Sequence, residues 1–125
     1  MSFDKRNATK IGNIGEEKVA QYLKSKGYII VKRNWKDRYG EVDIIAEKDN
    51  ILAFVEVKTR AEIALVSGLE AIDRGKMLRI KNEAEQFTKR MIGDYTARID
   101  VAEVTYSLRA DGKVYWKLNY IKSAF

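Results

Sequence analysis

Two β-prone stretches separated by a pair of turn-forming residues limit most strongly what this chain can fold into. Residues 41–48 (EVDIIAEK) and 51–59 (ILAFVEVKT) flank Asp49 and Asn50. Asp and Asn tolerate the backbone conformation that a two-residue hairpin turn requires, so this pattern predicts a β-hairpin. Both stretches are mainly apolar, but away from the turn, where Glu47 and Lys48 lie, four further charged residues interrupt them: Glu41, Asp43, Glu56 and Lys58.

A turn centred between Asp49 and Asn50 fixes which residues face each other. Residue 48 faces residue 51, and the ladder continues until 43 faces 56 and 41 faces 58. Since side chains alternate between the two faces of a strand, the residues divide into two sets. One predicted face is wholly apolar and buried: Val42, Ile44, Ala46, Ala53, Val55 and Val57. The other has apolar residues near the turn and all four charged residues at the open end: Ile45, Leu52, Phe54, Asp43, Glu56, Glu41 and Lys58.

The predicted register places the carboxylates of Asp43 and Glu56 opposite each other. Cross-strand Cβ atoms lie ~4.5–5.5 Å apart, and like charges at that separation repel. A shared proton or a divalent cation would relieve this repulsion. The alternative is a solvated sheet face with ordinary ion pairs. Because Ile45 and Phe54 border the charges, we favour a partly covered site in which Asp43 and Glu56 hold a hard cation.

The composition restricts the chemistry of such a site. The chain has no cysteine and no histidine, which excludes disulfides, thiol nucleophiles and Cys/His zinc sites. A metal must therefore be bound by oxygen, which favours Mg²⁺, Mn²⁺ or Ca²⁺. Such a cation polarises a phosphoryl oxygen and lowers the pKa of a bound water, and Lys58 could stabilise charge developing on phosphorus. The cluster thus predicts phosphodiester hydrolysis.

The rest of the chain predicts one α/β domain over residues 1–125. Apolar spacing indicates a helix over 9–26, which Gly27 would end. A second helix would begin at Asp73, with an apolar stripe of Met77, Ile80, Ala84, Phe87 and Met91. Residues 61–72, which include Gly68, are ambiguous. Strands are predicted over 28–35, 41–48, 51–59, 96–108 and 113–121. The order α-β-β-β-α-β-β favours a central mixed sheet flanked by helices.

The charge distribution indicates a polyanionic partner. The net charge is +6, and residues 1–38 carry ten of the 24 Lys and Arg residues but four of the 18 Asp and Glu residues. A merely soluble surface is the alternative interpretation. The candidate phosphate contacts are Arg33, Lys36, Arg38, Arg60, Lys76 and Arg79. Trp35 and Tyr39 could stack on unpaired bases or pack within the protein.

Neither a membrane segment nor a signal peptide is predicted. No apolar run approaches the ~18 residues that a membrane helix needs. The first residues, MSFDKRNATKIGNIGEE, lack an apolar stretch. We therefore expect no membrane association and a cytoplasmic location.

Several segments of the chain resemble known nucleases. Asp43, twelve intervening residues and then Glu56-Val57-Lys58 resemble the PD-(D/E)xK motif, with Val42 in place of the proline. Further segments resemble, in order, the YraN-like bacterial family: GEEKVAQYLKSKGYIIVKRNW, GEVDIIA, FVEVKTR, RIDVAEV and IKSAF. The resemblance is weakest over residues 61–95. It implies a restriction-endonuclease-like fold akin to Holliday-junction resolvases.

The resemblance also implies roles for individual residues. Glu16 falls on the helix glutamate that such nucleases add to the metal site, and Asp43 and Glu56 fall on the metal-binding acids. Val57 would offer its backbone carbonyl, and Lys58 is the motif lysine. By position alone Glu16 could equally be an acid favoured near a helix N-terminus. From the residues themselves we interpret Glu41 as orienting Lys58, and Asp100 as making a structural hydrogen bond.

These features together predict a Mg²⁺- or Mn²⁺-dependent nuclease. The resemblance favours DNA over RNA, and branched or structured DNA in particular. A homodimer would suit a two-fold symmetric substrate. Two alternatives remain open at this point: a non-catalytic nucleic-acid-binding module of the same fold, and a structural partner protein. Only the last predicts that metal ions leave the melting temperature unchanged.

Overall fold

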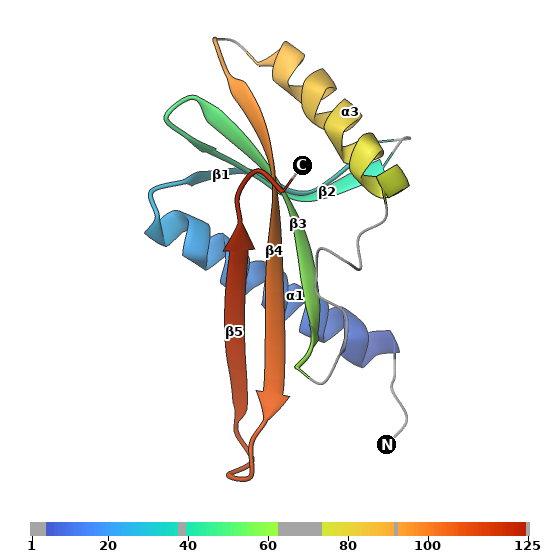
Figure 1. Cartoon of the computed structure of the whole chain (residues 1–125), viewed down its shortest axis with the longest axis vertical. Coiled ribbons are helices and arrows are strands. Elements are labelled where there is room, and N and C mark those ends of the chain that lie inside the picture. Colours follow the sequence, from blue (N-terminus) through green and yellow to red (C-terminus); the bar gives the residue numbers. More distant parts are fainter. Residues whose placement is uncertain (1–4, 38–39, 63–73, 92, 125) are drawn as a thin grey trace.

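The described part of the chain forms a five-stranded mixed sheet with one helix on each face. The structure is a computed structural model that describes residues 5–37, 40–62, 74–91 and 93–124. Its elements are α1 (Lys5–Ser25), β1 (Ile29–Asp37), β2 (Gly40–Lys48), β3 (Ile51–Ala61), α3 (Arg74–Arg90), β4 (Thr96–Leu108) and β5 (Val114–Ile121). This is the predicted order, and the architecture confirms the restriction-endonuclease-like α/β class (Figure 1). The proposed cap Asp73, and Gly68, lie outside the described residues.

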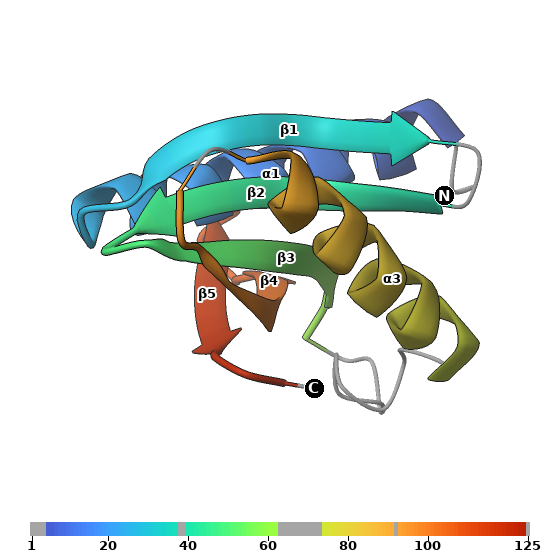
Figure 2. The ribbon, with the colours of Figure 1, turned by 90° about the horizontal axis from the view of Figure 1, so that it is seen from above.

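The strands lie in the order β1-β2-β3-β4-β5. Three of the four neighbouring pairs are antiparallel, whereas β3 and β4 are parallel. Parallel neighbours need a crossover connection, and α3 lies in the segment between β3 and β4. Figure 2 shows α1 and α3 on opposite sides of the sheet, so both of its faces are covered.

The ends of two elements follow from local sequence. Gly27 has φ of 92° and follows α1. The N–H of Gly27 donates to the carbonyl of Lys24, and the N–H of Tyr28 donates to the carbonyl of Leu23, both at 3.0 Å. This is the Schellman arrangement, which confirms Gly27 as the helix terminator. The predicted turn is also confirmed, because Asp49 and Asn50 both have positive φ between β2 and β3.

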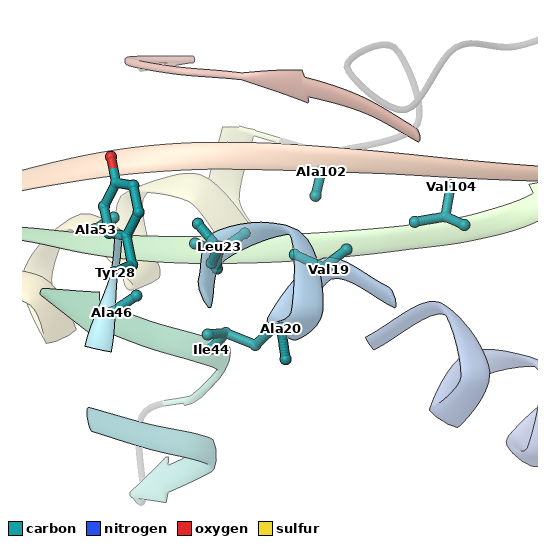
Figure 3. Close-up of a cluster of buried hydrophobic side chains, with 10 residues drawn as sticks. Val19, Ala20, Leu23, Tyr28, Ile44, Ala46, Ala53, Ala102 and Val104 are labelled. Atoms are coloured by element: carbon teal, nitrogen blue, oxygen red, sulfur yellow. The ribbon is translucent and has the colours of Figure 1, made fainter. Parts of the chain in front are cut away.

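Two buried apolar clusters hold the helices to the sheet. Val19, Ala20 and Leu23 of α1 pack on one face, against strand residues that include Ile44, Ala46, Ala53, Val55, Ala102 and Val104 (Figure 3). The predicted stripe of α3 packs on the other face: Met77, Ile80 and Ala84 are buried, and Phe87 and Met91 are partly buried. Strand residues of this second cluster include Ile45, Leu52, Phe54, Ile99 and Val101.

One residue of the hairpin lies on the face opposite to the predicted one. Val42 is buried in the α3 cluster, together with Ile45 and Phe54, and not with Ile44 beneath α1. The strict alternation fails because β2 leaves β3 before this residue. Here β2 continues with β1 alone, and Val42 pairs with Trp35, which also packs in the α3 cluster.

Neither of the two helices within the described residues has a stretch that is both long and apolar enough to span a bilayer.

Candidate metal and nucleic-acid site

The site forms where β2 and β3 separate. Their pairing runs from Lys48 with Ile51 to Ile44 with Val55, in the predicted register. In the described parts of both strands it ends there, so the expected backbone pairs 43–56 and 41–58 do not form. The reason is that β3 stays paired with β4 as far as Ala61, whereas β2 follows β1 to Gly40 (Figure 1).

The side chain of Asp43 bridges the gap between the separating strands. Its Oδ2 atom accepts a hydrogen bond of 2.8 Å from the backbone N–H of Val57. A carboxylate of β2 therefore lies against β3, directly between the neighbours of Val57, which are Glu56 and Lys58. The structure thus brings the two predicted acids together, although by a side-chain contact and not by strand pairing.

Glu56 is a buried carboxylate with two unlike oxygens. Its exposed fraction is 2%. Its Oε1 atom accepts a short hydrogen bond from Nζ of Lys76 on α3 and lies 3.7 Å from Nζ of Lys58. Its Oε2 atom is buried and has no hydrogen-bond partner within the described part of the chain. Since a buried carboxylate oxygen without a partner is costly, this atom marks a place where a ligand would be favoured.

The two acids interact electrostatically. Burial, followed by the negative charge of Glu56, raises the pKa of Asp43 to about 7. The Val57 N–H and the positive charge of Lys76 oppose this rise only in part. Repulsion between the two acids is therefore a property of the folded protein, as the hairpin register predicted.

Glu16 approaches the same acids from α1, across the sheet from α3. Burial raises the pKa of Glu16, and the charges of Glu41 and Glu56 act in the same direction. A hydrogen bond with the side chain of Asn34 and the charge of Arg33 oppose the rise. Asn34 has a left-handed φ of 51° and was not predicted as part of the site.

The neighbouring glutamate points elsewhere. Glu17 is ion-paired with Arg33 at 2.8 Å on the surface. The structure therefore separates Glu16, which is electrostatically linked to the site acids, from Glu17.

Lys58 and Lys76 make other contacts than those predicted for them. Glu41 is exposed and lies 3.6 Å from Nζ of Lys36, while Lys58 lies beside Glu56. The expected ion pair between Glu41 and Lys58 is therefore not among the contacts of the described residues. Lys76, predicted to contact phosphate, projects into the site and holds Glu56.

The helical pattern contained a signal for this position of Lys76. Lys76 directly precedes Met77 and lies four residues before Ile80, so it borders the apolar stripe. Glu83 borders the same stripe and is 1% exposed, which sequence reasoning also missed.

The remaining candidate contacts lie around the site in varied settings. Arg79 is exposed on α3, and Arg60 is partly buried on β3. Arg38 and Tyr39 lie outside the described residues. Trp35 packs edge-to-face on Phe87 with ring centroids 5.6 Å apart, which supports its packing interpretation.

A small cavity of about 140 Å³ adjoins the site and is lined by Gly40, Glu41, Lys76, Arg79, Ile80 and Glu83. A larger hollow of about 610 Å³ lies between α3 and β4, but none of its lining residues is a site acid. Small-molecule pockets usually enclose ~300–1,000 Å³, so the cavity beside the acids better suits a group on a large, surface-bound substrate.

The donor set suits a hard cation, although the ligands are not fully assembled. Within the described residues no three His, Cys, Asp or Glu side chains already form a metal-binding group. Glu56, whose Oε2 has no hydrogen-bond partner among the described residues, and Asp43, which contacts the next residue of β3, nevertheless provide neighbouring oxygen donors. The charge of Glu56 also acts on Glu16. Mg²⁺ and Mn²⁺ prefer such ligands and commonly retain water in part of their coordination shell.

Comparison with known proteins places the chain in a family. The sequence model of the family described as "Uncharacterised protein family UPF0102" matches residues 15–104. A UPF0102 protein of Caldicellulosiruptor saccharolyticus is 40% identical over 120 residues, covering 95% of this chain and 99% of the relative. A UPF0102 protein of Alkaliphilus metalliredigens is 38% identical, with coverages of 92% and 96%. One of Clostridium perfringens is 37% identical, with coverages of 97% and 98%. The chain therefore belongs to the UPF0102 family, in agreement with its YraN-like segments.

Proposed function

We propose that this protein is a metal-dependent nuclease that hydrolyses phosphodiester bonds in DNA. The observation that carries the proposal is the buried Glu56 carboxylate. Within the described part of the chain one of its oxygens has no hydrogen-bond partner, and the other meets two ammonium groups. Asp43 contacts the neighbouring residue, Val57. A structural salt bridge would need only one lysine and would leave no buried oxygen bare.

Asp43 and Glu56 would hold the cation, with Glu16 and the backbone carbonyl of Val57 as further oxygen donors. When bound, Mg²⁺ or Mn²⁺ would polarise the phosphoryl group and activate water for attack. The side chain of Lys58 is 29% exposed, and its Nζ atom lies 3.7 Å from Oε1 of the buried Glu56. It would therefore stabilise negative charge that develops on the phosphoryl oxygens.

A nucleic acid is the substrate class that fits best. The chain carries a net charge of +6, and Arg33, Lys36 and Arg79 are exposed around the open end of β2. The small size of the cavity beside the acids, about 140 Å³, also favours a substrate that lies across the surface. The preference for DNA, and for branched DNA, rests on the family resemblance alone. The homodimer is proposed because it would suit a two-fold symmetric substrate, and the cytoplasmic location remains an expectation from the sequence.

A cleavage screen tests the proposal. Duplex, single-stranded, flap and four-way DNA, and matching RNA, are incubated with Mg²⁺ or Mn²⁺. Wild type should cut at least one form, and EDTA should stop the reaction. Glu56→Gln and Lys58→Ala should cut at least about 100-fold more slowly yet bind the same substrate. Glu85→Gln, which changes an exposed glutamate of α3, is the matched control and should retain full activity.

The second candidate is a nucleic-acid-binding module without catalysis. It is favoured by Lys76, which already neutralises part of the Glu56 charge without a metal. Salt-sensitive binding of DNA, with no cleavage of any substrate in either metal, would decide for this module and against the nuclease.

A further inference from the structure

We propose that Lys76 is a positioning residue whose ammonium group substitutes for a metal ion. It holds Glu56 when no metal is bound and competes with a divalent ion for this carboxylate. The inference rests on the proposed function, since it takes a divalent cation as the competitor. It goes beyond that function by assigning Lys76 a role in metal affinity.

The ion pair between Lys76 and Glu56 joins α3 to β3. Without a metal, it supplies a positive charge beside a buried carboxylate. Glu56 lies on β3 opposite Val101 of β4 and is 2% exposed. Lys76 lies in the first turn of α3, which begins at Arg74. A buried carboxylate without a positive partner would strongly destabilise the folded protein. When no metal is bound, the ammonium group of Lys76 therefore stabilises the fold by pairing with Oε1 of Glu56.

The position of this lysine contradicts the usual preference at a helix start. The positive end of the helix dipole favours acids there, yet the first turn of α3 has none and carries Arg74 and Lys76. A local rule broken in this way is typical of a residue placed for a site and not for its helix. The partner that compensates is Glu56, whose hydrogen bond and charge raise the pKa of Lys76 despite its burial.

The lysine occupies only one side of the carboxylate. It contacts Oε1, whereas Oε2 has no hydrogen-bond partner among the described residues. If Glu56 and Asp43 held a divalent ion, its positive charge and that of the Lys76 ammonium group would repel each other. The side chain of Lys76 is 30% exposed and borders the cavity of about 140 Å³, so it has room to move away from Glu56.

The competition has two consequences. Lys76 should keep the protein stable without metal, and it should weaken metal binding relative to the same acids without a neighbouring cation. Once displaced, its ammonium group would lie at the cavity that Arg79 also lines, where a phosphate could attract it.

Mn²⁺ titration of Lys76→Met tests the proposal. Methionine keeps a long apolar side chain but removes the charge. Calorimetry should give an Mn²⁺ affinity at least about tenfold higher than that of wild type. Without metal the variant should melt at a lower temperature, and saturating Mn²⁺ should reduce the difference. Lys81→Met, an exposed lysine on the same helix, is the matched control and should behave as wild type in both measurements.

The outcomes separate the two proposals. If wild type binds Mn²⁺ but Lys76→Met binds it equally or more weakly, the role of Lys76 is wrong and the nuclease proposal stands. If none of the three proteins binds Mn²⁺, both fail. If Lys76→Met does not fold alone, refolding with Mn²⁺ that restores the native circular dichroism supports the competition. Failure to refold with Mn²⁺ overturns it, because the lysine is then only structural.

Discussion

The backbone N–H of Val57 donates a 2.8 Å hydrogen bond to Oδ2 of Asp43, across the gap that opens where β2 leaves β3. This bond holds a carboxylate of one strand against the other without strand pairing. It also brings the Asp43 charge next to Glu56, so the protein maintains a repulsion that burial makes stronger.

Replacing Asp43 with asparagine should stabilise the metal-free protein at high pH. Burial and Glu56 raise the pKa of Asp43 from 3.8 to about 7. Between these pH values the folded state holds a proton that the unfolded state has lost, so stability falls as pH rises, and the full cost is present above pH 7. Asparagine avoids this cost and can still accept the Val57 hydrogen bond.

The measurement is the melting temperature in EDTA. Asp43→Asn should exceed wild type by roughly 5 °C at pH 8, and by clearly less at pH 5. The exposed Asp94→Asn serves as a control for general charge loss. If Asp43→Asn is equally destabilised at both pH values, the Asp43 carboxylate is not destabilised by burial and by repulsion from Glu56.

Much of this site could be predicted because a hairpin register depends on local information. Asp49 and Asn50 fix the turn, and the alternation from the turn to Ile44 and Val55 follows directly. The separation of the strands beyond that point depends on β1 and β4. These partners are distant in sequence, so the face of Val42 and the loss of the 43–56 pair could not be read from the hairpin.

The position of Lys76 illustrates a second limit. Its spacing placed Lys76 at the border of the apolar stripe of α3. A side chain at that border can point either to solvent or to the sheet. Only the packing of α3 over β3 decides that its ammonium group meets Glu56. Conversely, Asp100 was correctly expected to be structural, because a lone acid between two buried β-branched residues needs fixed partners.

Removing Lys36 should weaken DNA binding in a salt-dependent manner. Lys36 is exposed on β1 and forms only a surface ion pair of 3.6 Å with Glu41, so little stability depends on it. If it contacts a phosphate, Lys36→Ala should reduce the slope of log affinity against log salt by about 1. Fluorescence anisotropy at several salt concentrations measures this. Lys89→Ala, at the far end of α3, should keep the wild-type slope, and equal slopes for all three proteins would exclude Lys36 from the interface.

Removing the hydroxyl of Tyr120 should destabilise the fold without affecting metal binding. This hydroxyl donates a 2.6 Å hydrogen bond to Oδ2 of the fully buried Asp100, which Arg98 and the backbone N–H of Ser123 also contact. Hydrogen bonds to a charged group contribute about 1.5–3 kcal/mol, so Tyr120→Phe should lose about this amount in urea unfolding. Its Mn²⁺ affinity should remain that of wild type, because Tyr120 lies on β5, two strands away from Glu56 on β3.

The matched control is Tyr115→Phe. Tyr115 also donates to an aspartate, Asp111, at 3.0 Å, but both residues are exposed. Its loss should therefore change stability by less than about 0.5 kcal/mol. If both variants lose a similar free energy of unfolding, the buried hydrogen bonds to Asp100 contribute no more to stability than an exposed one.

Alanine at Gly15 should push α1 away from the site. A Cβ atom at Gly15 would overlap Oγ1 of Thr59 and lie 3.1 Å from its Cβ and Cγ2 atoms, so no rotation of this β-branched side chain removes the clash. Gly15→Ala should cost about 1–3 kcal/mol in urea unfolding. Gly12→Ala lies one turn earlier in open space and should be neutral or stabilise the helix by up to about 1 kcal/mol. Because Glu16 follows Gly15 directly, the displaced helix should also diminish the rise in melting temperature that Mn²⁺ causes, whereas Gly12→Ala should preserve it. A Gly15→Ala variant as stable and as responsive to Mn²⁺ as Gly12→Ala would show that α1 does not need this close approach to position Glu16.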